Sequence, residues 1–224
     1  MARELRFYFD FISPYAYLAW KHIPALAERN GCTLVPVPVL FAGLLNEHGQ
    51  KGPAEIAPKR IYTFKHAVRL AHAVKLPLVP PPSHPFNPLL ALRVSSLDLD
   101  PTDRARIIDA FFDATWGGRG GIADKERVVA TLDVLGLDGA ALVVLAETQP
   151  IKDRVRAQTD AAIAAGVFGV PTTMVDDEPF WGYDALPHVE DYLNGKDPFQ
   201  ALKDDPEVLN RWIALPASAE RRRS

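Results

Sequence analysis

A serine directly before a proline, Ser13-Pro14, follows a short segment rich in aromatic residues, residues 5–10. A serine hydroxyl accepts a hydrogen bond from the first turn of a helix, and proline fits the first helical position, so the pair predicts a helix capped by Ser13. The N–H groups and the positive dipole end at such a position also suit an anion, including a thiolate. Taken alone, Ser-Pro is more typical of a plain cap than of a binding site.

A second candidate is Val170-Pro171, in a segment that enters a predicted strand. Proline removes one donor from a sheet, so its presence there needs a special arrangement. A cis peptide bond is one arrangement, and it would leave the carbonyl and N–H of Val170 to pair with the extended backbone of a ligand. The alternative is a trans proline at the first residue of the strand.

A third candidate is the segment from Trp181 to Asp184. A carboxylate just beyond the end of a strand could receive an ammonium group of a ligand. The alternative interpretation makes Asp184 the N-cap of the last predicted helix and Trp181 a core residue.

Several other chemistries lack the residues that they need. The single cysteine, Cys32, excludes an internal disulfide and a Cys-x-x-Cys pair, so a thiol–disulfide oxidoreductase is disfavoured and any thiol must come from outside the chain. The six histidines show no metal-ligand spacing, so we expect no metal site. No Gly-x-Ser-x-Gly segment supports a serine hydrolase.

The composition is that of a globular protein of 224 residues with a net charge of −3. The only block of like charge is Arg221–Arg223, so we expect no nucleic-acid partner. No run of about 18 apolar residues occurs, and the N-terminal residues lack the plan of a signal peptide. We therefore expect no membrane association and a cytoplasmic location.

Periodicity predicts a β-α-β start, with strands at 5–10 and 34–41 and one helix at 14–31. Pro36 and Pro38 place the second strand at a sheet edge. A block without convincing strands follows, and then a return to mixed structure. The predicted helices are 61–74, 89–97, 102–115, 124–135, 138–148, 151–165 and 184–195, and the last strands lie in 167–175 and 179–182.

Four segments together resemble the 2-hydroxychromene-2-carboxylate isomerases, which are similar to kappa-class glutathione transferases and DsbA-type oxidoreductases. They are residues 9–17 (FDFISPYAY), 112–117 (FDATWG), 166–172 (GVFGVPT) and 180–184 (FWGYD). The resemblance spans residues 5–195. It implies an α/β, thioredoxin-like fold with an inserted all-helical domain. We assign residues 1–45 and 152–200 to the thioredoxin-like domain, 46–151 to the helical insertion and 201–224 to a C-terminal extension.

The resemblance also implies a glutathione site. Ser13 would bind the glutathione sulfur and stabilise its thiolate, and Val170 would pair with the cysteinyl backbone beside Pro171. The turn that contains Trp181 would hold the γ-glutamyl end through two residues, Tyr183 and Asp184.

Two further segments match family patterns at the ligand. Residues 49–53 (GQKGP) match a loop that reaches glutathione, with Gln50 where asparagine is usual. Tyr183 similarly replaces a shorter polar residue. Asn87, in residues 85–89 (PFNPL), matches a pattern near the substrate cavity.

The implied activity is a glutathione-dependent isomerisation of a small aromatic substrate, in which a cyclic hemiketal opens and a trans benzylidenepyruvate forms. A thiolate suits this reaction, because reversible addition makes a conjugated double bond single while it rotates. The alternatives are a glutathione transferase or peroxidase, and a non-catalytic glutathione-binding domain. The family resemblance also implies a homodimer.

Overall fold

Four strands form one mixed sheet in the order β2-β1-β3-β4 in this computed structural model, which describes residues 2–202 and 205–215. The strands are β1 (Glu4–Phe9), β2 (Thr33–Pro38), β3 (Thr172–Val175) and β4 (Glu178–Trp181). β1 pairs in parallel with β2 and antiparallel with β3, which pairs antiparallel with β4. The predicted edge position of the proline-containing strand is confirmed. The basic residues 221–223 lie outside the described ranges.

The predicted single helix at 14–31 is wrong, because two helices occupy it. α1 (Pro14–Trp20) and α2 (Ile23–Arg29) meet at Lys21 and His22. Pro24 lies in the first turn of α2 and has no N–H to donate, so it starts a new helix.

Further helices fill the middle of the chain. They are α3 (Phe41–Glu47), the short 3-10 helix η1 (Pro53–Glu55), α4 (Ala57–Ala73), α5 (Leu89–Val94), α6 (Pro101–Trp116), α7 (Lys125–Val134), α8 (Gly139–Ala146) and α9 (Gln149–Ala164). The five predicted helices of the helical block are confirmed within a few residues. The sequence pattern does not predict α3, because the predicted second strand runs to Phe41, whereas β2 ends at Pro38.

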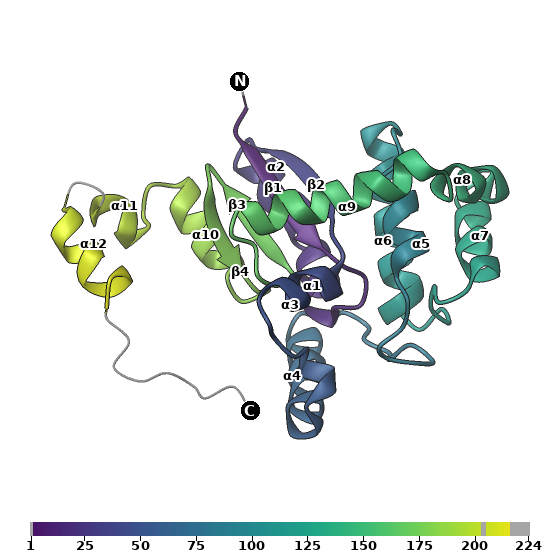
Figure 1. The fold of residues 1–224 in the computed structure, drawn as a ribbon, viewed down its shortest axis with the longest axis horizontal. Helices are drawn as coiled ribbons and strands as arrows, with labels where there is room; N and C mark the ends of the chain where they lie inside the picture. The colour runs from purple at the N-terminus through teal and green to yellow at the C-terminus, as the bar shows by residue number, and fades with distance from the viewer. Residues whose placement is uncertain (1, 203–204, 216–224) are drawn as a thin grey trace.

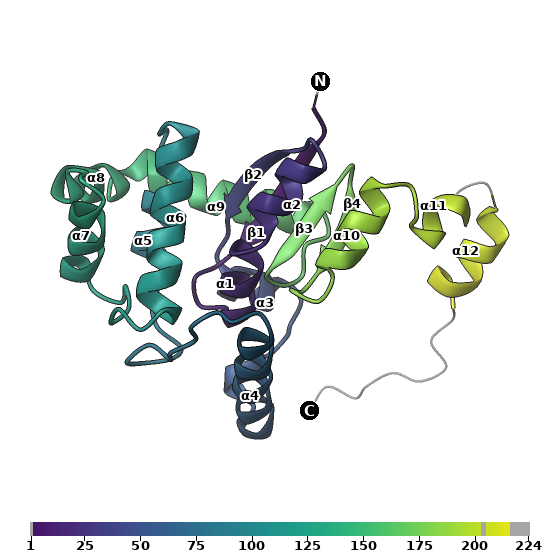
Figure 2. The ribbon, with the colours of Figure 1, turned by 180° about the vertical axis from the view of Figure 1, so that it is seen from behind.

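The helices cover both faces of the sheet. α9 crosses one face, and α2 and α10 (Leu186–Leu193) cover the other (Figures 1 and 2). α5 to α8 gather beyond the β2 edge, while α11 (Pro198–Leu202) and α12 (Pro206–Ile213) extend beyond the β4 edge (Figure 1). All four strands fall within residues 1–45 and 152–200, and the division of the chain into domains remains a prediction.

The main core joins the sheet to the helical block. Leu5, Phe7 and Phe9 alternate along β1 and are fully buried. The ring of Phe9 lies 5.6 Å from that of Phe112 in α6, between ring centroids. A separate cluster packs on the other face of the sheet, where Tyr8 meets residues of α3 and α9. The sheet and α6 therefore share one hydrophobic core, which fixes their relative position.

Among the described residues, no helix combines the length and hydropathy needed to cross a membrane.

Candidate functional site

Ser13 caps α1 and also reaches a distant segment of the chain. Its Oγ accepts a hydrogen bond from the amide of Ala16 at 3.2 Å, which is the predicted capping bond. The same hydroxyl donates to the carbonyl oxygen of Val170 at 3.4 Å. Ser13 is 9% exposed, so its hydroxyl lies at the edge of the buried interior. The structure thus brings together two segments that the sequence analysis selected separately.

The Val170-Pro171 peptide bond is cis, as the sequence analysis considered. The carbonyl of Val170 accepts a hydrogen bond from the Ser13 hydroxyl, so this oxygen is only partly available to a ligand. Within the described ranges, no residue accepts a hydrogen bond from the Val170 amide. This main-chain donor therefore fits the predicted pairing with an extended ligand backbone.

The β4–α10 turn is tied to the same place. The amide of Gly182 donates to the carbonyl of Pro171 at 2.9 Å. The exposed ring of Trp181 packs against Phe168, with centroids 5.2 Å apart. Tyr183 lies against His22, which holds the cap position at the start of α2, at a centroid distance of 5.6 Å. The turn therefore runs from the Pro171 loop to the junction of α1 and α2.

Asp184 lies at the exposed end of this turn. The interpretation of Asp184 as a helix cap is wrong, since α10 begins at Leu186 and Ala185 holds the cap position without a side-chain bond. The carboxylate of Asp184 contributes to a raised pKa of Tyr15, although burial is the larger cause. The exposed carboxylate of Asp184 has no hydrogen bond or ion pair to another described residue, so it is available to a cation.

Two predicted site residues are held by local bonds of their own. Gln50 is exposed, and its main-chain N–H donates to the carbonyl of Leu45 at 2.9 Å. Asn87 is exposed too, and its Oδ1 accepts a bond from the amide of Leu89 at the start of α5 at 3.0 Å. No hydrogen bond between described residues joins either side chain to Ser13, so their ligand contacts remain predictions.

Asp10 supports the site and was not selected from the sequence. Its buried carboxylate accepts bonds from the amides of Ile12 at 3.1 Å and Phe41 at 2.9 Å. Burial raises the pKa of Asp10 to about 7, partly opposed by these two hydrogen bonds. Asp10 therefore fastens α3 to the loop that leads into Ser13. The sequence signal for this supporting role is a carboxylate placed between an apolar strand and the Ser-Pro pair, where burial requires hydrogen-bond partners.

A second unpredicted contact joins α1 to α4. The hydroxyl of Tyr15 lies 3.0 Å from Nδ1 of His66, and the ring of Tyr62 stacks on the same imidazole. α4 extends from the rest of the molecule beside α1 (Figure 2). The Tyr15–His66 contact places the middle of α4 next to the turn of Ser13.

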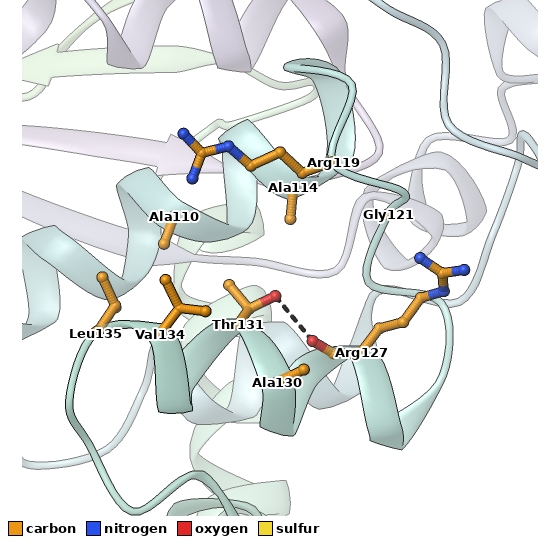
Figure 3. Close-up of a pocket in the computed structure, with 9 residues that line it drawn as sticks. All are labelled: Ala110, Ala114, Arg119, Gly121, Arg127, Ala130, Thr131, Val134 and Leu135. Atoms are coloured by element: carbon orange, nitrogen blue, oxygen red, sulfur yellow. Dashed lines mark hydrogen bonds between the residues drawn. The ribbon is translucent and has the colours of Figure 1, made fainter.

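The helical block contains a separate hollow of about 230 Å³ between α6 and α7 (Figure 3). Small and apolar side chains such as Ala110 and Val134 line it. Arg119 and Arg127 line its rim, but their guanidinium groups point in different directions (Figure 3). None of the predicted site residues lines this hollow, so it is distinct from the Ser13 region. The described residues also contain no cluster of three potential metal ligands.

Comparison with known proteins identifies the family of this chain. The family model described as "DSBA-like thioredoxin domain" matches residues 4–194. A 2-hydroxychromene-2-carboxylate isomerase of Sphingobium xenophagum is 30% identical over 86% of this chain and 99% of that protein. Glutathione S-transferase kappa 1 of Rattus norvegicus is 23% identical over 77% of this chain and 80% of its own length.

A solved structure of a 2-hydroxychromene-2-carboxylate isomerase superimposes with a TM-score of 0.78 at 27% identity. It covers 96% of this chain and 100% of that one. The predicted α/β fold, a thioredoxin-like sheet with many inserted helices, is confirmed. The chain therefore belongs to the DsbA-like thioredoxin domain family and, within it, to the enzyme family of the 2-hydroxychromene-2-carboxylate isomerases.

Proposed function

We propose that this protein is a glutathione-dependent isomerase of the 2-hydroxychromene-2-carboxylate type. The observation that carries the proposal is the contact between the hydroxyl of Ser13 and the main chain of Val170, directly before the cis proline Pro171. This contact supports a site where one hydroxyl and one free main-chain amide face the same small region.

The residues present fit glutathione. The Val170 amide, which has no acceptor among the described residues, would pair with the ligand backbone. Asp184 would receive the ammonium of the γ-glutamyl end, and Tyr183 and Trp181 would flank it from the same turn. Gln50 would approach from the loop that follows α3. Each of these groups is a donor, an acceptor or an aromatic surface of the kind that a small peptide needs.

Glutathione would supply the thiol for reversible addition to a conjugated double bond, which the chain itself lacks at this position. The hydroxyl of Ser13 can turn its proton from the Val170 carbonyl toward a sulfur anion while its oxygen keeps the Ala16 amide. A hydrogen bond to the anion stabilises it and lowers the pKa of the thiol. A serine also cannot become trapped as a mixed disulfide, so the thiol would be released unchanged.

The proposed substrate is a small aromatic carboxylate, with Asn87 at its cavity. We also propose a homodimer, a cytoplasmic location, and no nucleic-acid or membrane partner. Light scattering on the purified protein tests the dimer: a mass twice that of the 24.7 kDa chain supports it, and a mass equal to one chain contradicts it.

Dialysed enzyme tests the function directly. The proposal predicts that isomerisation of 2-hydroxychromene-2-carboxylate is slow without glutathione and is restored by catalytic amounts. The glutathione concentration, measured before and after turnover, stays constant. Full activity in dialysed enzyme would contradict the requirement for glutathione.

A kappa-like glutathione transferase is the second candidate, because kappa-class enzymes are among the relatives. The same assay separates the two functions, since a transferase or peroxidase consumes glutathione in proportion to product. A non-catalytic glutathione-binding domain would show glutathione-dependent thermal stabilisation without turnover.

A further inference from the structure

Two aromatic side chains hold the loop that leads into Ser13. Nε1 of Trp116, at the end of α6, donates to the carbonyl of Phe11 at 2.9 Å. Nε2 of His84, in the loop before α5, lies 2.9 Å from the carbonyl oxygen of Ile12. Two successive carbonyls before Ser13 are thus each bonded by a ring N–H from the helical part of the chain.

The contacts of His84 fix its tautomer. A carbonyl oxygen only accepts, so the proton must reside on Nε2. Nδ1 is buried, and it has no partner among the residues that the structure describes. The ring packs against Phe64 and Trp116, at centroid distances of 5.1 and 5.7 Å. Burial lowers the pKa of His84, and hydrogen bonding to Ile12 only partly opposes this effect. His84 therefore acts as a neutral donor.

The His84 bond acts on the peptide unit next to Ser13. The Ile12 carbonyl and the Ser13 amide belong to one planar peptide group. His84 donates to the oxygen of that peptide group, and the Ser13 N–H of the same group donates to the carbonyl of Asp10 at 3.2 Å. With both ends held, the plane cannot rotate freely, and the position of the Ser13 side chain is set by it.

We infer that His84, assisted by Trp116, is a positioning residue that sets Ser13 in the orientation needed to stabilise a thiolate. Only the effect of His84 on catalysis rests on the proposed function. The geometric relationship itself can be tested without glutathione.

The experiment uses the full chain with Ser13→Cys, which reports the local environment through its own thiol. Cys32→Ser removes the natural cysteine, so alkylation by iodoacetamide reads one position only. The rate of alkylation as a function of pH gives the pKa of the introduced thiol. The parent protein should show a pKa below that of a free cysteine, because the thiol lies at the first turn of α1.

His84→Phe in this background keeps an aromatic ring but removes the donor to Ile12. The expected result is a rise of roughly one unit in the thiol pKa, which means about tenfold less thiolate well below that pKa. His84→Gln keeps an N–H donor at similar reach and should restore most of the parent value. Trp116→Phe removes the other donor and should raise the thiol pKa in the same direction.

Tyr17→Phe is the matched control. It deletes the hydrogen bond from the Tyr17 hydroxyl to the carbonyl of Pro77, at 2.9 Å. That bond ties α1 to the loop between α4 and α5 and does not involve residues 10–13. The control should lower the melting temperature and leave the thiol pKa unchanged. An unchanged pKa in a folded His84→Phe protein, or an equal shift in Tyr17→Phe, would overturn the inference. If His84→Phe does not fold, Trp116→Phe decides by the same criterion.

Calorimetric titration of the wild-type protein with glutathione separates this inference from the proposed function. No binding would refute glutathione dependence and leave the positioning result intact. Binding together with a pKa that does not respond to His84 would refute the positioning role alone.

Discussion

The hydroxyl of Ser13 donates a hydrogen bond of 3.4 Å to the carbonyl of Val170, although 157 residues separate the two in sequence. The contact joins the first turn of α1 to the loop that enters β3. It requires the β1–β3 pairing, in which Tyr8 lies opposite Thr172. The antiparallel pairing of β1 with β3 therefore brings the two halves of the candidate site together.

Ser13→Ala should reduce turnover by roughly 10- to 100-fold, because a hydrogen bond to a charged group contributes about 1.5–3 kcal/mol. Steady-state kinetics with saturating glutathione measures this effect. Ser95→Ala is the control, since it removes another buried hydroxyl that donates to the carbonyl of Ala91 at 2.9 Å. If both variants lose turnover equally, the effect belongs to stability and not to the site.

Gly182→Ala should weaken glutathione binding about tenfold, as expected for the loss of one charged hydrogen bond. Gly182 has a φ of +103°, and an added Cβ would lie 2.5 Å from Oδ1 of Asp184, so the carboxylate must move. Gly166→Ala imposes comparable backbone strain at a φ of +84° and meets no atom within 4 Å. Calorimetry should show weakened binding for Gly182→Ala alone. Equal affinities in the two variants would exclude Asp184 from the γ-glutamyl end.

Asp10 should make the protein less stable as the pH rises from about 4 to 7. Burial raises the folded-state pKa of Asp10 from an ordinary 3.8 to about 7, so the folded state binds more protons than the unfolded state within this window. Above pH 7 the contribution of Asp10 to the free energy of unfolding no longer changes with pH. Asp10→Asn should remove this part of the pH dependence when unfolding free energies are measured by urea titration. Parallel wild-type and variant curves across the window would contradict the assignment.

The Tyr15–His66 contact should couple the two side chains by about 1 kcal/mol, the usual net contribution of one hydrogen bond. Their atoms lie 3.0 Å apart between the hydroxyl and Nδ1. Tyr15→Phe, His66→Phe and the double variant form a double-mutant cycle for the free energy of unfolding. Strictly additive losses would mean that the contact does not stabilise the α1–α4 junction.

The features that were predictable from the sequence are local ones. Ser-Pro predicted the cap at Ser13, and the prolines of the second strand predicted its edge position. The break between α1 and α2 also had a local signal in Pro24, which the apolar periodicity outweighed. The helix at Phe41 was missed because its first amide is bonded by Asp10, which lies 31 residues away.

The supporting contacts of the site depend on tertiary packing. His84 and Ile12 are 72 residues apart, and Tyr15 and His66 are 51 apart, so neither local propensity nor periodicity relates them. The spacing of the six histidines in the sequence excludes a metal site but says nothing of other roles. A neutral imidazole that donates to a main-chain carbonyl leaves no spacing pattern in the sequence.

Titration of the glutathione thiol in the complex tests the central claim most directly. The thiolate absorbs in the ultraviolet, so a pH titration of the complex with wild-type protein and with Ser13→Ala gives both pKa values. The account predicts a pKa well below that of free glutathione in the wild-type complex and a return toward the free value in Ser13→Ala. The same pKa in both complexes would contradict a role for Ser13 in stabilising the thiolate.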